Sequence, residues 1–124
     1  MKCLFQYLAN SVSEKVKVVD SKNRLQIHLA AVFACNFTNA MYVAAYQIIE
    51  NNLTKKDTDL LLPIMQQSFQ KLQKVHPKHS QTGPAMRNDK LVMKKHLALI
   101  KNNKQLTQVY KTLSDLIITQ QHLK

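Results

Sequence analysis

The stretch KNRLQIHLAAVFACNFTNAMYVAAYQIIEN, residues 22–51, decides the fold of this chain. It holds no glycine and no proline, and from Leu25 to Ile49 it holds no Asp, Glu, Lys or Arg. Its composition predicts one helix of about 30 residues, roughly 45 Å long. We expect Ser21 to cap the N-terminus of this helix. Because the helix is apolar around most of its circumference, we expect protein to bury it on all sides.

The uncharged stretch is also long enough to be a transmembrane helix, which needs about 20 apolar residues. Six polar side chains interrupt it: Gln26, His28, Asn36, Thr38, Asn39 and Gln47. Polar groups of this kind are costly in hydrocarbon. We therefore predict that the chain has no membrane partner.

Polar residues follow one side of the predicted helix. At about 100° per residue, with His28 at 0°, Tyr46 falls at roughly 0°, Asn39 at roughly 20°, Asn36 at roughly 80°, and Tyr42 and Arg24 at roughly 320°. The other side holds Phe33, Phe37, Ala40, Ala44 and Ile48. This pattern has two interpretations. The helix lines a substrate cleft, or it is a core or interface helix whose polar groups are hydrogen-bonded locally.

The remaining composition narrows the class of protein. With 124 residues the chain has room for one ordinary domain. Its single glycine, Gly83, excludes both glycine-rich phosphate loops within the chain, so we expect no nucleotide site and no dinucleotide binding here. Few glycines and prolines also argue against a β-sandwich or barrel. The predicted fold class is mainly α, a helical bundle built on one long central helix.

The other expected elements are a helix over 2–12, a strand over 14–20, a loop over 51–59, a helix over 60–75, a loop over 76–88, and helices over 89–101 and 106–122. The strand is the only one expected, and a lone strand leaves its backbone unpaired. Its partner must belong to another molecule or to a part of the protein outside this chain. Asp57 or Asp59 is expected to cap the third helix, and Pro63 lies in its first turn or kinks it.

Two cysteines, Cys3 and Cys35, are too few for a disulfide framework. We expect Cys35 to be a buried free thiol, which fits a reducing compartment. The N-terminus lacks the apolar run of a signal peptide, so we predict a cytoplasmic protein. No histidine has metal-ligand spacing to a cysteine or carboxylate, and we predict no metal site.

The charge is concentrated in the second part of the chain. The net charge is +11, and residues 51–124 carry thirteen basic and four acidic side chains. This balance is compatible with nucleic acid, anionic lipid, a phosphorylated ligand or an acidic protein. Lys90, Lys94 and Lys101 share a helix face that we expect to be solvated. No aromatic residue is interleaved with them, so no specific nucleic-acid partner is predicted.

A second polar segment, Gln81-Thr82-Gly83-Pro84-Ala85-Met86-Arg87-Asn88-Asp89, lies in the 76–88 loop and at the start of the next helix. Gly83 can adopt a left-handed backbone. Thr82 offers a hydroxyl, and Arg87 offers a two-pronged donor for a carboxylate or phosphate. Asp89 either caps the following helix or orients Arg87. The segment is interpreted as a structural turn or as a ligand-binding loop.

Two blocks together resemble a known family. One is His28-Leu29-Ala30-Ala31-Val32-Phe33-Ala34-Cys35-Asn36-Phe37-Thr38-Asn39; the other is the 81–89 segment, followed by His96-Leu97 and Tyr110-Lys111-Thr112-Leu113-Ser114. Their order resembles a C-terminal domain of unknown function that follows a Rossmann-like NAD(P)-binding domain in bacterial proteins assigned as oxidoreductases. Those proteins are similar to pyrroline-carboxylate and ketopantoate reductases, within the 6-phosphogluconate dehydrogenase C-terminal-like superfamily. Asn88 departs from the pattern, since the family more often has glycine there.

The resemblance implies that residues 1–20 are the closing helix and strand of a Rossmann-like domain lying outside this chain. Residues 21–124 would then be a helical substrate-binding and dimerisation domain, inactive alone, of an NAD(P)-dependent oxidoreductase. The implied catalytic residue is His28. The implied substrate-binding residues are Asn36, Thr82, Arg87 and Asp89, facing a small anionic substrate. The implied assembly is a homodimer built on the long helix.

A second function of a different class stays open. The chain would be a stand-alone basic helical module that binds nucleic acid or an acidic protein. A nucleotide-binding unit encoded upstream of residue 1 would decide between the two.

Overall fold

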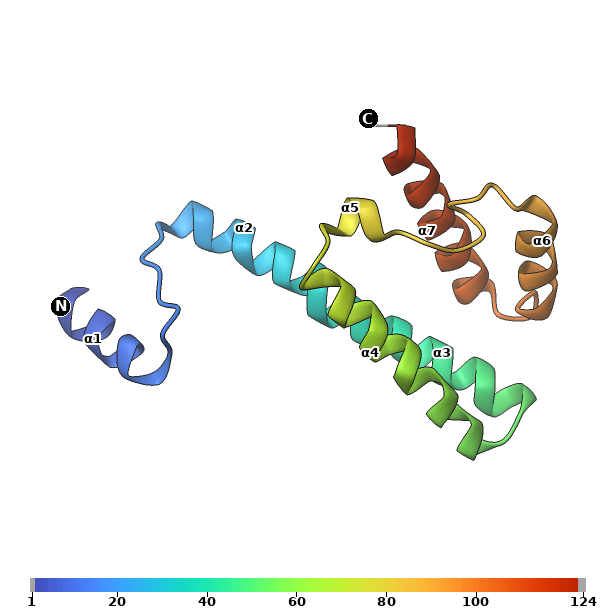
Figure 1. The fold of residues 1–124 in the computed structure, drawn as a ribbon, viewed down its shortest axis with the longest axis horizontal. Coiled ribbons are helices and arrows are strands. Elements are labelled where there is room, and N and C mark those ends of the chain that lie inside the picture. The colour runs from blue at the N-terminus through green and yellow to red at the C-terminus, as the bar shows by residue number, and fades with distance from the viewer. Residues whose placement is uncertain (1, 123–124) are drawn as a thin grey trace. The chain divides into compact units, whose positions relative to one another are not determined.

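Helices make up all the regular structure that the computed structural model describes, which covers residues 2–122, with side chains for 4–121 (Figure 1). The prediction of a mainly α fold built on one long helix is therefore confirmed. The chain divides into two compact units, residues 1–45 and residues 46–124.

The first unit begins with α1 (Lys2–Val12), whose large apolar residues from Leu4 to Val12 are exposed. The segment from Ser13 to Asp20 follows without any helix or strand. The strand predicted over 14–20 is therefore absent. The physical reason is that the described residues offer no second strand for its backbone to pair with, so alternating valines alone do not make a strand.

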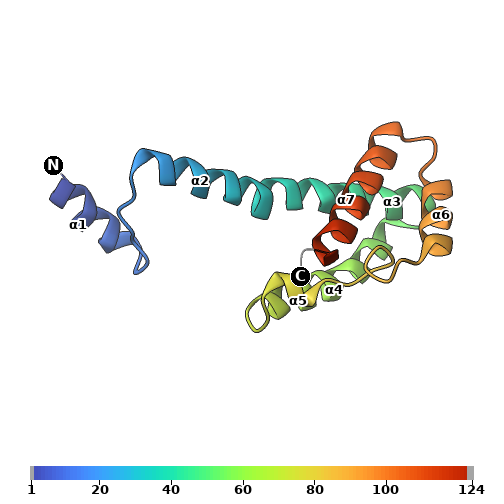
Figure 2. The ribbon, with the colours of Figure 1, turned by 90° about the horizontal axis from the view of Figure 1, so that it is seen from above.

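The long helix is continuous from Ser21 to Asn52 but not uniform (Figure 2). It consists of α2 (Ser21–Ala31), a π-helical turn η1 (Val32–Phe37) and α3 (Thr38–Asn52). Its N-cap is Asp20, not the predicted Ser21. Asp20 has extended backbone angles, φ −69° and ψ 170°, and its carboxylate accepts a hydrogen bond from the Asn23 amide at 2.8 Å. Asp and Ser are both good caps, and the backbone angles place Asp20 at that position.

The long helix is exposed within this chain, which corrects the prediction that protein buries it on all sides. None of its most apolar 18-residue window is buried, and Phe33 and Phe37 are 60% and 50% exposed. Among the described residues it is the one helix whose length and composition suffice to cross a membrane. Cys35 is exposed as well, so the expected buried thiol is also wrong. The side chain of Cys3 lies outside the described residues.

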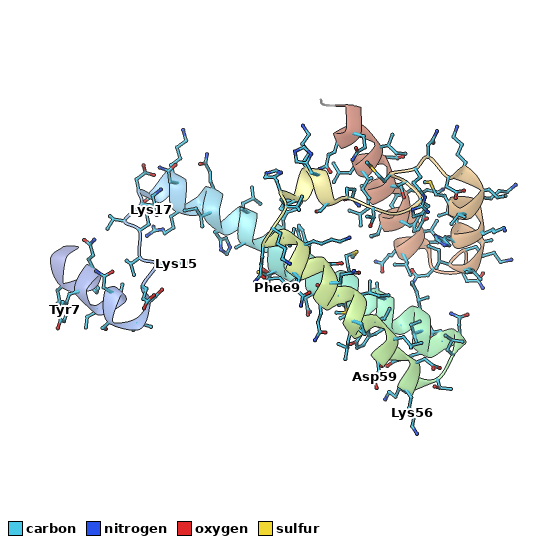
Figure 3. The ribbon with its side chains drawn as sticks, viewed as in Figure 1. Tyr7, Lys15, Lys17, Lys56, Asp59 and Phe69 are labelled. Atoms are coloured by element: carbon cyan, nitrogen blue, oxygen red, sulfur yellow. The ribbon has the colours of Figure 1, made fainter. Side chains whose placement is uncertain are left out.

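In the second unit, Thr54 starts the 3-10 helix η2 (Lys55–Leu60), which leads into α4 (Leu61–Leu72). The Thr54 amide and hydroxyl donate to the Asp57 carboxylate at 2.8 and 2.7 Å. Thr54 thus caps η2, with Asp57 as its capping-box partner. The N-cap of α4 is Leu60, which makes no side-chain cap hydrogen bond, so the prediction that Asp57 or Asp59 caps this helix is wrong. Pro63 lies in the first turn of α4, one of its two predicted places. Figure 3 shows the exposed Phe69 further along α4.

The rest of the second unit is a short helix, α5 (Pro77–Ser80), and the helical hairpin of α6 (Lys90–Leu99) and α7 (Lys104–His122). The expected loop over 76–88 therefore contains one helical turn. Lys90, Lys94 and Lys101 are exposed, as predicted. Only Ala85 and Ser114 are buried among the described side chains, so this unit covers little apolar surface of its own.

Candidate substrate site

His28 and Asn36 lie on the long helix in the first unit, and both are exposed. They are eight residues apart, which is at most roughly 12 Å along the helix axis. No hydrogen bond joins their side chains in the described residues. The imidazole and the amide can therefore bind two parts of one ligand, but Asn36 does not fix the His28 ring.

A hollow of about 550 Å³ lies beside the start of the same helix. The extended segment Lys17–Asp20 forms one wall, and Asn23, Gln26, Ile27 and Ala30 form the other. Neither His28 nor Asn36 lines this hollow. The hollow therefore lies along the same part of the helix as His28, with Ile27 and Ala30 in its lining, but His28 itself does not line it.

The 81–89 segment in the second unit is a tight turn with two residues in the left-handed region. Gly83 has φ +107° and Asn88 has φ 54°. The Asp89 amide donates to the Pro84 carbonyl at 2.9 Å, and the Asn88 amide donates to the Ala85 carbonyl at 3.2 Å. Asparagine is the residue after glycine that best tolerates positive φ. This explains how Asn88 can adopt a backbone conformation that favours glycine.

Asp89 performs the structural role that the sequence left open. Its Oδ1 accepts a hydrogen bond from the Val92 amide at 3.1 Å, which makes Asp89 the N-cap of α6. No ion pair joins it to Arg87 among the described residues. Thr82 and Arg87 are exposed, so a hydroxyl and a guanidinium face solvent from the same turn. These two side chains are available to bind an anionic group.

A histidine–tyrosine pair joins α6 to α7 and was not predicted. His96 Nδ1 and the Tyr110 hydroxyl are 3.0 Å apart, and their rings meet edge-on at 5.9 Å between centroids. Loss of contact with water raises the pKa of Tyr110 above its ordinary value. Helical spacing alone could not show that the two residues pair, because they lie on different helices.

Two further hollows lie among the described residues of the second unit. One, of about 390 Å³, is lined by His76, Pro77, Lys78, Gln81, Gln120 and Gln121. The other, of about 260 Å³, lies among the ends of α3, α6 and the start of α7, with Ile48, Leu99 and Leu106 in its lining. Of the 81–89 segment, only Gln81 lines either hollow. Within the described residues, no three His, Cys, Asp or Glu side chains gather closely enough to hold a metal ion.

The comparisons with known proteins identify the family to which this helical chain belongs. Residues 2–117 match the family described as a domain of unknown function, DUF2520, and the chain belongs to this family. A comparison with curated proteins gave no match.

One similar solved structure is described as a putative NADP oxidoreductase from Bacteroides fragilis. It is 36% identical in sequence, with a TM-score of 0.86. The match covers 92% of this chain and 43% of the other. The present chain thus spans less than half the length of that protein.

The five predicted site residues fall in both units, His28 and Asn36 in the first and Thr82, Arg87 and Asp89 in the second. That they serve a single substrate stays a prediction.

Proposed function

We propose that this chain is the substrate-binding and dimerisation domain of an NAD(P)-dependent oxidoreductase. Membership of the DUF2520 family and the likeness to a protein described as a putative NADP oxidoreductase support the proposal. NAD(P) would be held by a Rossmann-like domain outside these residues, because the chain has a single glycine and hence no glycine-rich phosphate loop. The compartment would be the cytoplasm.

The observation that carries the dimer is the exposure of the long helix. The rings of Phe33 and Phe37 pack edge-on, with 5.0 Å between their centroids. In the single chain, Phe33 is more than half exposed and Phe37 is half exposed. Burying an aromatic or aliphatic side chain gains about 1.5–3 kcal/mol, so a continuous apolar helix face favours association. Small residues such as Ala30 and Ala34 allow a second copy of this helix to approach closely.

A separate apolar surface lies on α1 and supports the assignment of residues 1–20 to a preceding domain. Its exposed side chains are Leu4, Phe5, Leu8 and Val12, at 62%, 66%, 51% and 87%. The extended segment after α1 carries Lys15 and Lys17 (Figure 3) and has backbone groups without a strand partner. A sheet edge would pair these groups, and the same protein surface would cover the apolar face of α1.

The proposed chemistry assigns one role to each site residue. Reduction of a carbonyl or imine by hydride needs a proton donor at the heteroatom, and His28 is suited to that transfer near neutral pH. Asn36 would hydrogen-bond the substrate. The Arg87 guanidinium would bind an anionic group, with the Thr82 hydroxyl beside it. Asp89 would hold the turn by capping α6.

Sedimentation equilibrium at micromolar concentration tests the dimer. The expected mass is roughly twice 14.3 kDa, and the variant Phe37→Glu is expected to sediment as a monomer because it places a charge in the apolar face. Tyr7→Glu is the matched control, since Tyr7 is an aromatic residue on α1 that is 73% exposed and off the apolar face of that helix. A monomeric unmodified chain with full helix content would refute the proposed dimer.

A further inference from the structure

The regular helix is interrupted between His28 and Asn36. From Val32 to Phe37 the backbone forms a π-turn, with hydrogen bonds between residues five apart in place of four. Phe33 and Phe37 pack edge-on across this turn, with their ring planes at 79°. A π-turn is rare in helices and adds about one residue to the turn that contains it. The residues after it are therefore rotated relative to those before it.

The rotation changes which polar residues line up with His28. One extra residue corresponds to roughly 100° of helix rotation. If this rotation is spread evenly over the six residues of the turn, about two thirds of it has accumulated at Asn36. The angle between Asn36 and His28 around the helix axis therefore falls from roughly 80° to roughly 20°. Asn39 lies beyond the turn and moves from roughly 20° to roughly 80° on the other side. The π-turn exchanges Asn39 for Asn36 as the polar neighbour of His28 along the helix.

The hydroxyl of Thr38 donates a hydrogen bond across this altered turn. Thr38 Oγ1 donates to the Phe33 carbonyl, five residues earlier, at 3.2 Å, while the Thr38 amide donates to Cys35. In the regular helices of this chain, the hydroxyls of Ser68 and Thr119 donate to carbonyls four residues earlier. The Thr38 hydroxyl thus donates to a carbonyl one residue further back than these hydroxyls do in the regular helices, which fits the wider π-turn.

We propose that Thr38 is a positioning residue, whose hydroxyl holds the π-turn and thereby turns Asn36 onto the same line of the helix as His28. The proposal rests on the function proposed above, because it takes His28 and Asn36 as the residues that face the substrate. With the turn in place, the imidazole and the amide contact one bound molecule from two successive positions on the helix. Without it, Asn39 takes the place of Asn36.

Nuclear magnetic resonance of the isotopically labelled 124-residue chain tests the role of Thr38. Thr38→Val removes the hydroxyl at constant shape, and Thr38→Ser keeps it. Thr119→Val is the matched control, because it removes a hydroxyl bonded four residues back in a regular helix. The measurements are contacts between protons of residues five apart over 32–38, and the carbonyl ¹³C shift of Phe33.

We expect Thr38→Val to lose the five-residue contacts, to gain four-residue contacts throughout, and to move the Phe33 carbonyl upfield. Thr38→Ser and Thr119→Val should retain the unmodified pattern over 32–38. Contacts between residues five apart that survive in Thr38→Val would overturn the proposal. Their absence from the unmodified chain would also overturn it, and that outcome does not depend on whether a variant folds. This result is independent of the proposed dimer. A monomeric chain can show the π-turn, and a dimeric chain can keep the π-turn without the Thr38 hydroxyl.

Discussion

The hydrogen bond from the Val92 amide to Asp89 makes the stability of α6 depend on one carboxylate. Asp89 is half-buried and accepts this bond at 3.1 Å. Replacing an N-cap Asp by Ala costs about 1 kcal/mol, within a range of about 0.5–2. Asn keeps the acceptor oxygen and loses only the interaction of the charge with the helix dipole, about 0.3–1 kcal/mol. The expected order of unfolding free energy is therefore Asp above Asn above Ala.

Urea unfolding of the 124-residue chain measures this order, and the midpoint of thermal unfolding should fall by roughly 4 °C for Asp89→Ala. Asp115→Ala is the control, since it removes an exposed acidic side chain from α7 without removing a cap. Equal unfolding free energies for the unmodified chain, Asp89→Asn and Asp89→Ala would refute the capping role. A double-mutant cycle with Arg87→Ala should give a coupling below about 0.5 kcal/mol. A larger coupling would mean that Asp89 orients the guanidinium after all.

Two further outcomes follow from the loops of the second unit. Gly83→Ala should lower the unfolding free energy by about 1–3 kcal/mol through backbone strain alone, because φ is +107° and an added Cβ meets no atom within 4 Å; an unchanged urea midpoint would contradict this. Hydrogen bonds from Thr54 lower the pKa of Asp57, so their stabilisation is present above the ordinary carboxyl pKa, about 4, and is lost as the pH falls through the lowered value. In a carboxyl ¹³C titration, Thr54→Ala should raise the pKa of Asp57, and an unchanged pKa would contradict the assigned cause.

The helices could be predicted from the sequence where local chemistry decides them. The absence of glycine and proline over 22–51 predicts an unbroken helix, and Asp89 precedes α6 as a cap should. Where two cap residues lie side by side, composition does not choose between them. At Asp20 and Ser21 the choice depends on which residue takes extended backbone angles, and that is set by the path of the preceding segment.

The surroundings of the candidate site were less predictable from the sequence. Two features, the π-turn and the His96–Tyr110 pair, depend on three-dimensional geometry that residue spacing does not reveal. The polar stripe assumed a constant 100° per residue, and the π-turn at Val32–Phe37 changes that phase halfway along. A threonine after a pair of phenylalanines is too common a pattern to predict the turn. Likewise, His96 and Tyr110 pair across two helices, and their spacing of fourteen residues has no helical meaning within one.

The prediction of a strand over 14–20 and the prediction of a buried long helix are wrong for the same reason. Sequence periodicity shows which side of an element is apolar, but it does not show what covers that side. Lys15 to Val18 alternate as an edge strand does, and the long helix is apolar as a buried helix is, yet neither meets its partner within the described chain. Lipid and protein would both cover an uncharged helix of this length. They differ in what they offer to His28 and Asn36, because hydrocarbon gives a polar group no hydrogen bond, whereas a protein interface or a water-filled cleft does. For a helix that carries His28 and Asn36 and also exposes Phe33 and Phe37, we therefore propose a second copy of the chain and a substrate as partners in place of a membrane.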